Sequence, residues 1–157
     1  MKLYLKAAVI TLVAPGGVGG LLPALVVSGR DTADGAKMAL AVCLMGIGAV
    51  MYVRCAWDFA AFGKGTPLPI DAPKRLVIRG LYRYSRNPMY VGLITMVAGW
   101  AILFWSIILV GYGLFLFVFF SVFIHFHEEP HLSREFGEEY EEYKSQVGRW
   151  LPRPTRR

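Results

Sequence analysis

Residues 89–126, MYVGLITMVAGWAILFWSIILVGYGLFLFVFFSVFIHF, decide the fold of this chain. They are apolar almost without interruption, and the stretch is too long for one helix across the roughly 30 Å hydrocarbon layer of a bilayer. The best place for a turn is the polar or flexible stretch between Trp105 and Gly113. We therefore predict two spanning helices joined by a tight turn, a transmembrane hairpin over residues 91–127.

The chain before this hairpin has the same apolar character. Of its 157 residues 55% are hydrophobic, and the mean hydropathy of +0.46 is far above that of an ordinary soluble domain. Two further apolar blocks, Leu3–Val27 and Met38–Phe62, predict that residues 1–62 form the first two spans, the first of them kinked by prolines and glycines. The expected fold is an all-α, polytopic transmembrane helical bundle of about four spans, a single membrane domain over residues 1–157.

The distribution of charge predicts the orientation of this bundle. The basic residues lie between apolar blocks, so the net charge of +6 indicates membrane topology and no nucleic-acid partner. The loop over residues 63–90 carries six of them and should therefore be cytosolic. We expect an integral inner or plasma membrane protein whose two termini and polar chemistry face the cytoplasm. In the second span, Arg54 and Asp58 lie one helical turn apart and are expected to pair.

The last part of the chain, residues 128–157, is the predicted cytosolic C-terminal segment. Apolar and aromatic residues recur in it at helical spacing, with glutamates on the remaining faces: Leu132, Phe136, Tyr140, Tyr143 and Val147. This pattern predicts one amphipathic helix at the cytosolic face of the bundle.

Two polar clusters flank the predicted hairpin. Residues 79–90, RGLYRYSRNPMY, are cationic and aromatic, and residues 125–131, HFHEEPH, are anionic and carry imidazoles. A helical hairpin brings the two together, so a ligand between them would meet both signs of charge and an aromatic surface. The plainer interpretation is that the arginines and tyrosines anchor the helices and the glutamates pair with them. Against it stands the density of charged groups at membrane depth, where charges are costly and tend to be functional.

The same region carries a resemblance to a known family. GTPLPIDAPKRLVIRGLYRYSRNPMYVG at residues 65–92, the pair Glu128-Glu129 and FGEEYEEYKSQVGRWLP at residues 136–152 follow one another in the chain. In this order they resemble the isoprenylcysteine carboxyl methyltransferase and phospholipid methyltransferase superfamily of membrane enzymes. The element RNPMY at residues 86–90 is short and by itself only a weak indication of this family. Its order with the proline-rich loop, the paired glutamates and the tyrosine-rich tail is a specific indication.

The resemblance implies methyl transfer from S-adenosylmethionine to a lipophilic acceptor that enters from the membrane, a prenylcysteine-like carboxylate or another lipid. It places the cofactor on the cytosolic side, against the residues Tyr82, Arg86, Asn87, Pro88, Tyr90, Glu128 and Glu129. Arg86 would suit the cofactor carboxylate, and the glutamates would suit ribose hydroxyls or the ammonium group. As candidate catalytic residues we take His127 as a base and Arg149 as a group that orients an acceptor carboxylate. Oligomeric state stays open, although Gly46, Gly48, Gly92 and Gly99 permit close helix approach.

This chain departs from the family pattern at Asn87, where many relatives have histidine. An asparagine has no ionisable group, so a mechanism that needs a base at this position is in doubt. It still donates and accepts hydrogen bonds. A carboxylate or thiolate acceptor is already anionic and needs no base, whereas an amine acceptor would have to lose a proton.

Three other interpretations compete with methyl transfer. Residues 127–131 fit the zinc-protease pattern H-E-x-x-H, but Pro130 disfavours the continuous helix that this metal site requires and more naturally starts the following helix, so no metal site is predicted. Membrane sterol reductases that use NADPH have a similar end, although the paired glutamates look more like the methyltransferases. A non-enzymatic membrane subunit that binds lipid or a partner protein explains the basic loop but does not predict the glutamate pair opposite it.

Overall fold

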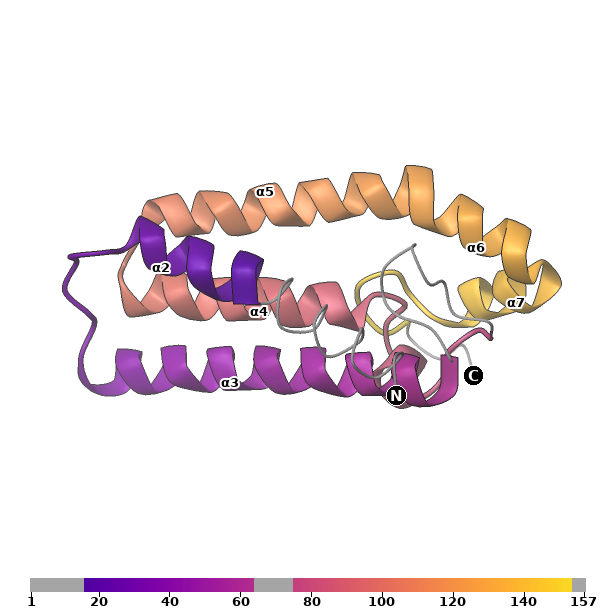
Figure 1. Ribbon diagram of the computed structural model, residues 1–157, viewed down its shortest axis with the longest axis horizontal. Helices are drawn as coiled ribbons and strands as arrows, with labels where there is room; N and C mark the ends of the chain where they lie inside the picture. The colour runs from indigo at the N-terminus through magenta and orange to yellow at the C-terminus, as the bar shows by residue number, and fades with distance from the viewer. Residues whose placement is uncertain (1–15, 64–74, 154–157) are drawn as a thin grey trace.

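The computed structural model describes residues 16–63 and 75–153. The beginning of the first predicted span and the proline-rich part of the basic loop lie outside the described residues. All regular structure within the described residues is helical, which confirms the all-α fold class. Figure 1 shows an elongated bundle with its helices along the long axis.

Helix α4 (Pro88–Leu103) lies at the centre of the bundle. It packs along α3 (Gly35–Asp58) on one side and against α5 (Ile107–Phe123) on the other (Figure 1). The π-helical segment η1 (Gly17–Leu21) and the short α2 (Leu22–Val26) also contact α4 and α5. Since α4 contacts both long neighbours, the position of its first residues is fixed from two sides.

The turn of the hairpin lies at the start of the stretch in which the sequence predicts it. Helix α4 ends at Leu103 and α5 begins at Ile107. Ser106, which is buried, caps α5, and its hydroxyl oxygen accepts a hydrogen bond from the backbone N–H of Leu109 at 3.4 Å. Trp105 adopts a positive φ of 48°, and the Nζ atom of Lys37 lies 4.4 Å from the centroid of its ring.

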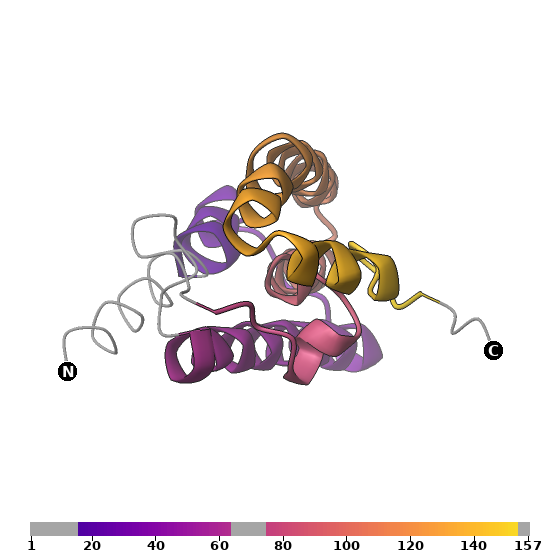
Figure 2. The ribbon, with the colours of Figure 1, turned by 90° about the vertical axis from the view of Figure 1, so that its right-hand side faces the viewer.

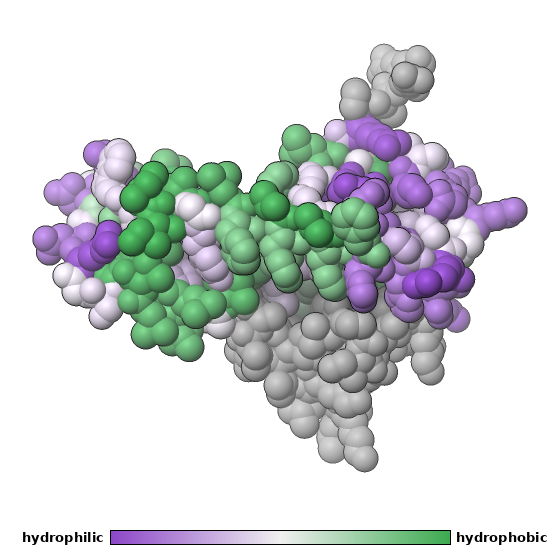
Figure 3. All heavy atoms as spheres, turned by 90° about the horizontal axis from the view of Figure 1, so that it is seen from above, coloured by the Kyte–Doolittle hydropathy of each residue, from purple (hydrophilic) through white to green (hydrophobic). Residues whose placement is uncertain are grey.

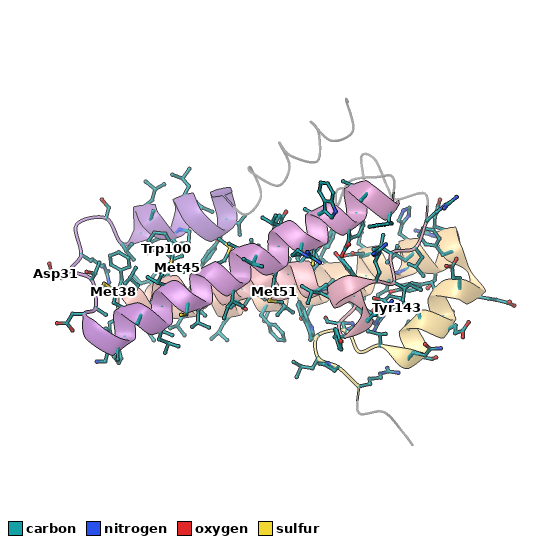
Figure 4. All side chains as sticks on the ribbon, turned by 90° about the horizontal axis from the view of Figure 1, so that it is seen from below. Asp31, Met38, Met45, Met51, Trp100 and Tyr143 are labelled. Atoms are coloured by element: carbon teal, nitrogen blue, oxygen red, sulfur yellow. The ribbon has the colours of Figure 1, made fainter. Side chains whose placement is uncertain are left out.

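Three glycines allow α3 and α4 to approach closely. A Cβ atom added to Gly92 would lie 2.8 Å from the carbonyl oxygen of Gly48, and one added to Gly99 would lie 2.8 Å from that of Ala41. Met45 and Met51 of α3, labelled in Figure 4, flank these contacts. The expectation that glycines permit close helix approach is confirmed at three of the four positions, whereas at Gly46 no atom of the described residues lies within 4 Å of an added Cβ.

The second arm of the hairpin continues beyond the predicted end of its span. Helix α5 runs into the π-helical η5 (Ile124–Glu128) and then into α6 (Glu129–Phe136). The backbone N–H of Glu129 bonds to the carbonyl of Ile124, the wider spacing of a π-turn. Pro130 occupies the first turn of α6, as predicted, but the helix does not break before it. The π-turn moves the preceding carbonyls out of the α-helical register, in which the proline ring would clash with the carbonyl of Phe126.

The amphipathic C-terminal segment forms two helices where the sequence predicts one. Gly137, with φ of 52°, separates α6 from α7 (Glu138–Gln146). Glycine adopts this left-handed conformation without the penalty that a Cβ atom carries. The predicted apolar positions still gather in one cluster across both helices, formed by Tyr140, Tyr143 and Val147 with Leu76, Leu132 and Phe136 packed against them. The periodicity was therefore informative about burial and wrong about helix continuity.

Two stretches of helix among the described residues are long and apolar enough to cross a membrane, Gly35–Gly63 and Ile107–Phe136. The first joins α3 to a π-helical turn, η2 (Phe59–Gly63). Two shorter apolar helices, Gly17–Val26 and Pro88–Leu103, lie beside them. In Figure 3 an apolar surface separates polar residues at the two ends of the molecule. This distribution is that of a membrane protein, and the count of about four spans stays a prediction.

At the polar end of α3, Asp58 pairs with a residue from the loop and not with Arg54. Its Oδ1 atom lies 3.8 Å from Nε of Arg79, and the guanidinium carbon of Arg79 lies 3.5 Å from the centroid of the Phe62 ring. The Asp58 carboxylate is directed toward Gly80, whereas Arg54 is exposed. The pairing predicted from helical spacing is thus wrong, because the loop supplies a partner that helical periodicity cannot reveal.

Candidate functional site

The two polar clusters of the sequence meet at one end of the bundle. The 3-10 turn η4 (Gly80–Arg83) and the residues before α4 supply one cluster, and the junction of η5 and α6 supplies the other. Figure 2, which faces this end, shows α6 and α7 beside the segment that precedes α4. Together they enclose a cavity of about 420 Å³. Seven of the nine predicted site residues line it: Tyr82, Arg86, Asn87, Tyr90, His127, Glu128 and Glu129.

Glu129 is the centre of an ion-pair network. Nη1 of Arg86 donates to its Oε1 at 2.7 Å, while Arg149 donates from Nε to Oε1 at 3.0 Å and from Nη2 to Oε2 at 2.7 Å. The Arg149 pair is the bidentate geometry in which a guanidinium binds a carboxylate most specifically. The network therefore holds one carboxylate between two guanidinium groups and by itself carries a net positive charge.

Glu128 accepts fewer hydrogen bonds than Glu129. The hydroxyl of Tyr90 donates to its Oε2 at 3.1 Å, and no described residue donates to its Oε1. Both glutamates follow the apolar helix α5. Burial raises the pKa of Glu128, and the neighbouring Glu129 adds to this rise against the Tyr90 hydrogen bond. Burial also opposes ionisation of Glu129, but Arg149 and Arg86 outweigh it and lower the pKa of that carboxyl.

Tyrosines of the C-terminal helix α7 complete the polar wall. Nη1 of Arg86 also donates to the hydroxyl of Tyr140 at 3.2 Å, and the hydroxyl of Tyr143 donates to the carbonyl of Tyr82 at 2.7 Å. From the sequence, both tyrosines are predicted only as members of an apolar face. Tyrosines at buried positions were the available signal, because a buried phenol hydroxyl usually has a hydrogen-bond partner.

Another part of the cavity wall is apolar. It is formed by residues from η2, the loop, the start of α4 and the junction of α5 and η5: Phe59, Leu76, Val77, Met89, Phe123, Ile124 and Phe126. One cavity thus joins a charged region to a hydrocarbon-like one. Such a space suits a ligand or a pair of ligands with a polar and a lipophilic part.

The two remaining predicted residues lie outside the cavity wall. Pro88 is the first residue of α4, where its fixed φ favours helix initiation, and it is fully buried. Arg149 lies behind Glu129 in the segment after α7. Its backbone carbonyl accepts hydrogen bonds from the Ser85 hydroxyl at 3.1 Å and from Nδ2 of Asn87 at 3.0 Å. Ser85 is a further residue that the sequence analysis does not single out.

Of the three histidines, His127 and His131 line the cavity and His125 does not. Nδ1 of His125 lies 3.4 Å from Nη2 of Arg149, and the ring of His127 stacks on Phe123 with 5.5 Å between centroids. Both imidazoles are exposed. Within residues 16–63 and 75–153, no group of three or more His, Cys, Asp or Glu side chains is arranged to hold a metal ion.

Fold and site together define a helical membrane protein with a ligand cavity at one end of its bundle. Residues 36–139 match the phospholipid methyltransferase family, and the chain belongs to this family, which is part of the isoprenylcysteine carboxyl methyltransferase-type superfamily. The matched region includes every predicted site residue except Arg149. Comparison with curated proteins gives no match. Family membership implies a membrane methyltransferase and confirms the resemblance drawn from the sequence motifs.

Proposed function

We propose that this protein transfers the methyl group of S-adenosylmethionine to a lipophilic acceptor at the cytosolic face of the membrane. One observation carries the proposal: in a chain of the phospholipid methyltransferase family, the Arg86–Tyr90 segment and the glutamate pair converge on one cavity. The methyl donor contributes the electrophilic carbon bound to its sulfonium. The residues of this chain bind, orient and desolvate the reactants.

The cavity has the size and the polar groups that this cofactor needs. Its volume of about 420 Å³ falls within the range of roughly 300–1,000 Å³ that is usual for small-molecule sites. Nε of Arg86 is buried and has no hydrogen-bond partner in the part of the chain that the structure describes, which supports it as a charged donor for the cofactor carboxylate. Glu128 offers an acceptor for ribose hydroxyls or the ammonium group, and the rings of Tyr82 and Tyr90 offer aromatic surface to the adenine or the sulfonium.

The two glutamates have different proposed roles. Glu129 is occupied by Arg86 and Arg149, so it holds the arginines in place and is not itself available to the cofactor. Glu128 binds the cofactor directly. Arg149, for which we considered a contact with an acceptor carboxylate, acts through Glu129. His127, exposed at the mouth, stays the candidate base for an acceptor that must lose a proton.

The apolar wall of the cavity supports a lipophilic acceptor. Phe59, Met89 and Phe126 belong to separate elements and together form part of this apolar wall. A lipid with its reactive group toward Glu128 and its chain against this wall would bury apolar surface at both partners. The membrane lipids themselves, or a lipid-modified substrate, are the classes of acceptor that this wall suits.

Titration of the purified protein in detergent with S-adenosylmethionine, or with its demethylated product, tests the proposal. We expect the parent to bind and Glu128→Gln to bind about tenfold more weakly, since it loses a charge-assisted hydrogen bond. The thermal unfolding temperature of Glu128→Gln should stay close to that of the parent, because the two arginines pair with Glu129 and not with Glu128. Glu138→Gln on the exposed face of α7 is the matched control. A folded parent that fails to bind would refute S-adenosylmethionine as the cofactor.

The proposed orientation is testable with single cysteines in a background that lacks Cys43 and Cys55. Asp34→Cys lies at the start of α3 and Ser145→Cys at the end of α7, at opposite ends of the bundle. In intact cells an impermeant thiol reagent should label the cysteine at position 34 and spare the one at position 145. The reverse pattern would place the cavity outside the cytoplasm and contradict the proposed orientation.

A further inference from the structure

Asn87 occupies a helix-capping position but does not cap the helix. It directly precedes α4 and has a non-helical backbone with φ of −130° and ψ of 47°, yet its side chain makes no hydrogen bond to the first turn. Asparagine at this position normally accepts a hydrogen bond from one of the first free N–H groups. Here the side chain is 5% exposed and its Nδ2 donates instead to the carbonyl of Arg149, 62 residues away in sequence. The amide is thus committed to a long-range contact.

Three consecutive residues hold the segment that follows α7. The Ser85 hydroxyl and Asn87 Nδ2 share the Arg149 carbonyl, and the backbone N–H of Arg86 donates to the carbonyl of Gly148 at 2.9 Å. Residues 148–152 form no regular helix, so their carbonyls depend on partners of this kind. We call these contacts of residues 85–87 with Gly148 and Arg149 the clasp.

The clasp and the ion-pair network meet at Arg149. Its carbonyl is held by Asn87, and its guanidinium holds Glu129, which in turn binds Arg86. Because the segment around Arg149 has no helix to fix it, loss of the clasp would let its guanidinium move away from Glu129. We infer that Asn87 is a positioning residue, which acts on cofactor binding through Arg149 and not through contact with the cofactor. This inference rests on the proposed function.

The clasp defines what the side chain at position 87 has to supply. The position requires an N–H donor toward a carbonyl oxygen, and a neutral imidazole N–H meets that requirement as an amide does. No proton transfer is involved. An aspartate, by contrast, is close in shape to asparagine but would present a carboxylate oxygen to the carbonyl, where neither atom donates. Asn87→His and Asn87→Asp therefore separate the donor requirement from the shape of the side chain.

The first experiment reads the clasp without any ligand. Trypsin cleaves after Arg149, whereas Pro154 protects the bond after Arg153, so release of the peptide that begins at Trp150 reports access to the clasped segment. By mass spectrometry, Asn87→Asp should raise the rate of this cleavage at least about fivefold relative to the parent. Asn87→His should stay within about twofold. Gln146→Glu, which makes the same change of amide to carboxylate on an exposed residue of α7, is the control. An unchanged rate in Asn87→Asp would refute the clasp.

The second experiment asks whether Asn87 acts through Arg149. In titrations with S-adenosylmethionine, Asn87→Asp should weaken binding about tenfold or more in the parent background, as expected when a carboxylate oxygen faces the Arg149 carbonyl and the guanidinium is displaced. In an Arg149→Ala background the same change should have less than about a threefold effect, because the guanidinium through which it acts is gone. Equal losses in both backgrounds would mean that Asn87 touches the ligand itself and would overturn the inference. A parent that binds no cofactor would refute the proposed function, while the cleavage rates still decide the clasp.

Discussion

Replacing Glu129 with alanine should weaken S-adenosylmethionine binding at least about a hundredfold and lower the stability of the protein by about 3–5 kcal/mol. The variant leaves the guanidiniums of Arg86 and Arg149 next to each other with no carboxylate between them. Only 7% of the Arg86 side chain is exposed, so water cannot replace the lost partner there. Repulsion should move both arginines, and the charged wall of the cavity would lose its geometry. Thermal unfolding in detergent and cofactor titration measure the two effects.

The matched variant Glu129→Gln separates charge from shape. It keeps one carbonyl oxygen for an arginine but loses the negative charge. Its affinity for the cofactor and its stability should therefore lie between those of the parent and those of Glu129→Ala. If Glu129→Ala instead bound the cofactor as the parent does, the ion-pair network would have no part in the site. That result, beside a weakened Glu128→Gln, would leave cofactor binding to Glu128 alone.

The same carboxylate should give stability a defined dependence on pH. Arg149 and Arg86 lower the pKa of Glu129 from its ordinary value of 4.5, so the ionised form is favoured in the folded state. Its contribution is complete above the unfolded value and is lost as the pH falls through the lowered pKa. The parent should therefore be less stable at pH values below about 4.5 than above, and the difference between parent and Glu129→Gln should shrink there. A difference that stays constant down to pH 3 would contradict this pairing.

The sequence predicted the elements that follow from local hydrophobicity. The apolar hairpin, its turn near Trp105 and the convergence of the two polar clusters all depend on chain segments that are close in sequence or joined by one hairpin. What it could not predict are the partners of individual charges. Asp58 takes Arg79 from the loop, and Glu129 takes Arg149 from the tail, and neither pairing has a periodic signal.

The division of roles between adjacent glutamates was equally inaccessible from the sequence. Glu128 and Glu129 are successive residues of one continuous helix, so their side chains point about 100° apart, and only the surrounding elements decide which meets the arginines. The break at Gly137 illustrates a different limit. The apolar period of the tail continues across the glycine, since buried side chains on two helices can keep the spacing of one. The apolar period of a sequence predicts which side chains are buried, but it does not show whether they belong to one helix or to two.

The packing of α3 against α4 holds the start of α4, and with it the site, in position. A substitution that disturbs this packing should therefore have a second large effect. Gly48→Leu should destabilise the protein by about 3 kcal/mol or more, because its side chain would have to occupy the space of the backbone carbonyl of Gly92 and of Met96. Backbone atoms cannot turn aside as a flexible side chain does, so α4 has to move away from α3. Gly92 lies one turn from Pro88, and the displacement would be passed to Asn87 and its clasp.

Gly46→Leu is the control that the same helix provides. It makes an identical substitution two residues earlier, where an added Cβ meets no atom of residues 16–63 and 75–153 within 4 Å, and it replaces a poor helix former with a good one. It should unfold at or slightly above the temperature of the parent and bind cofactor with unchanged affinity, whereas Gly48→Leu should lose both stability and binding. Measured side by side in one detergent, equal tolerance of the two leucines would show that α3 and α4 do not approach closely. Loss of stability and binding in both variants would point instead to a requirement for glycine along the whole helix. Only a loss confined to Gly48→Leu agrees with an interface that holds the first turn of α4 in place.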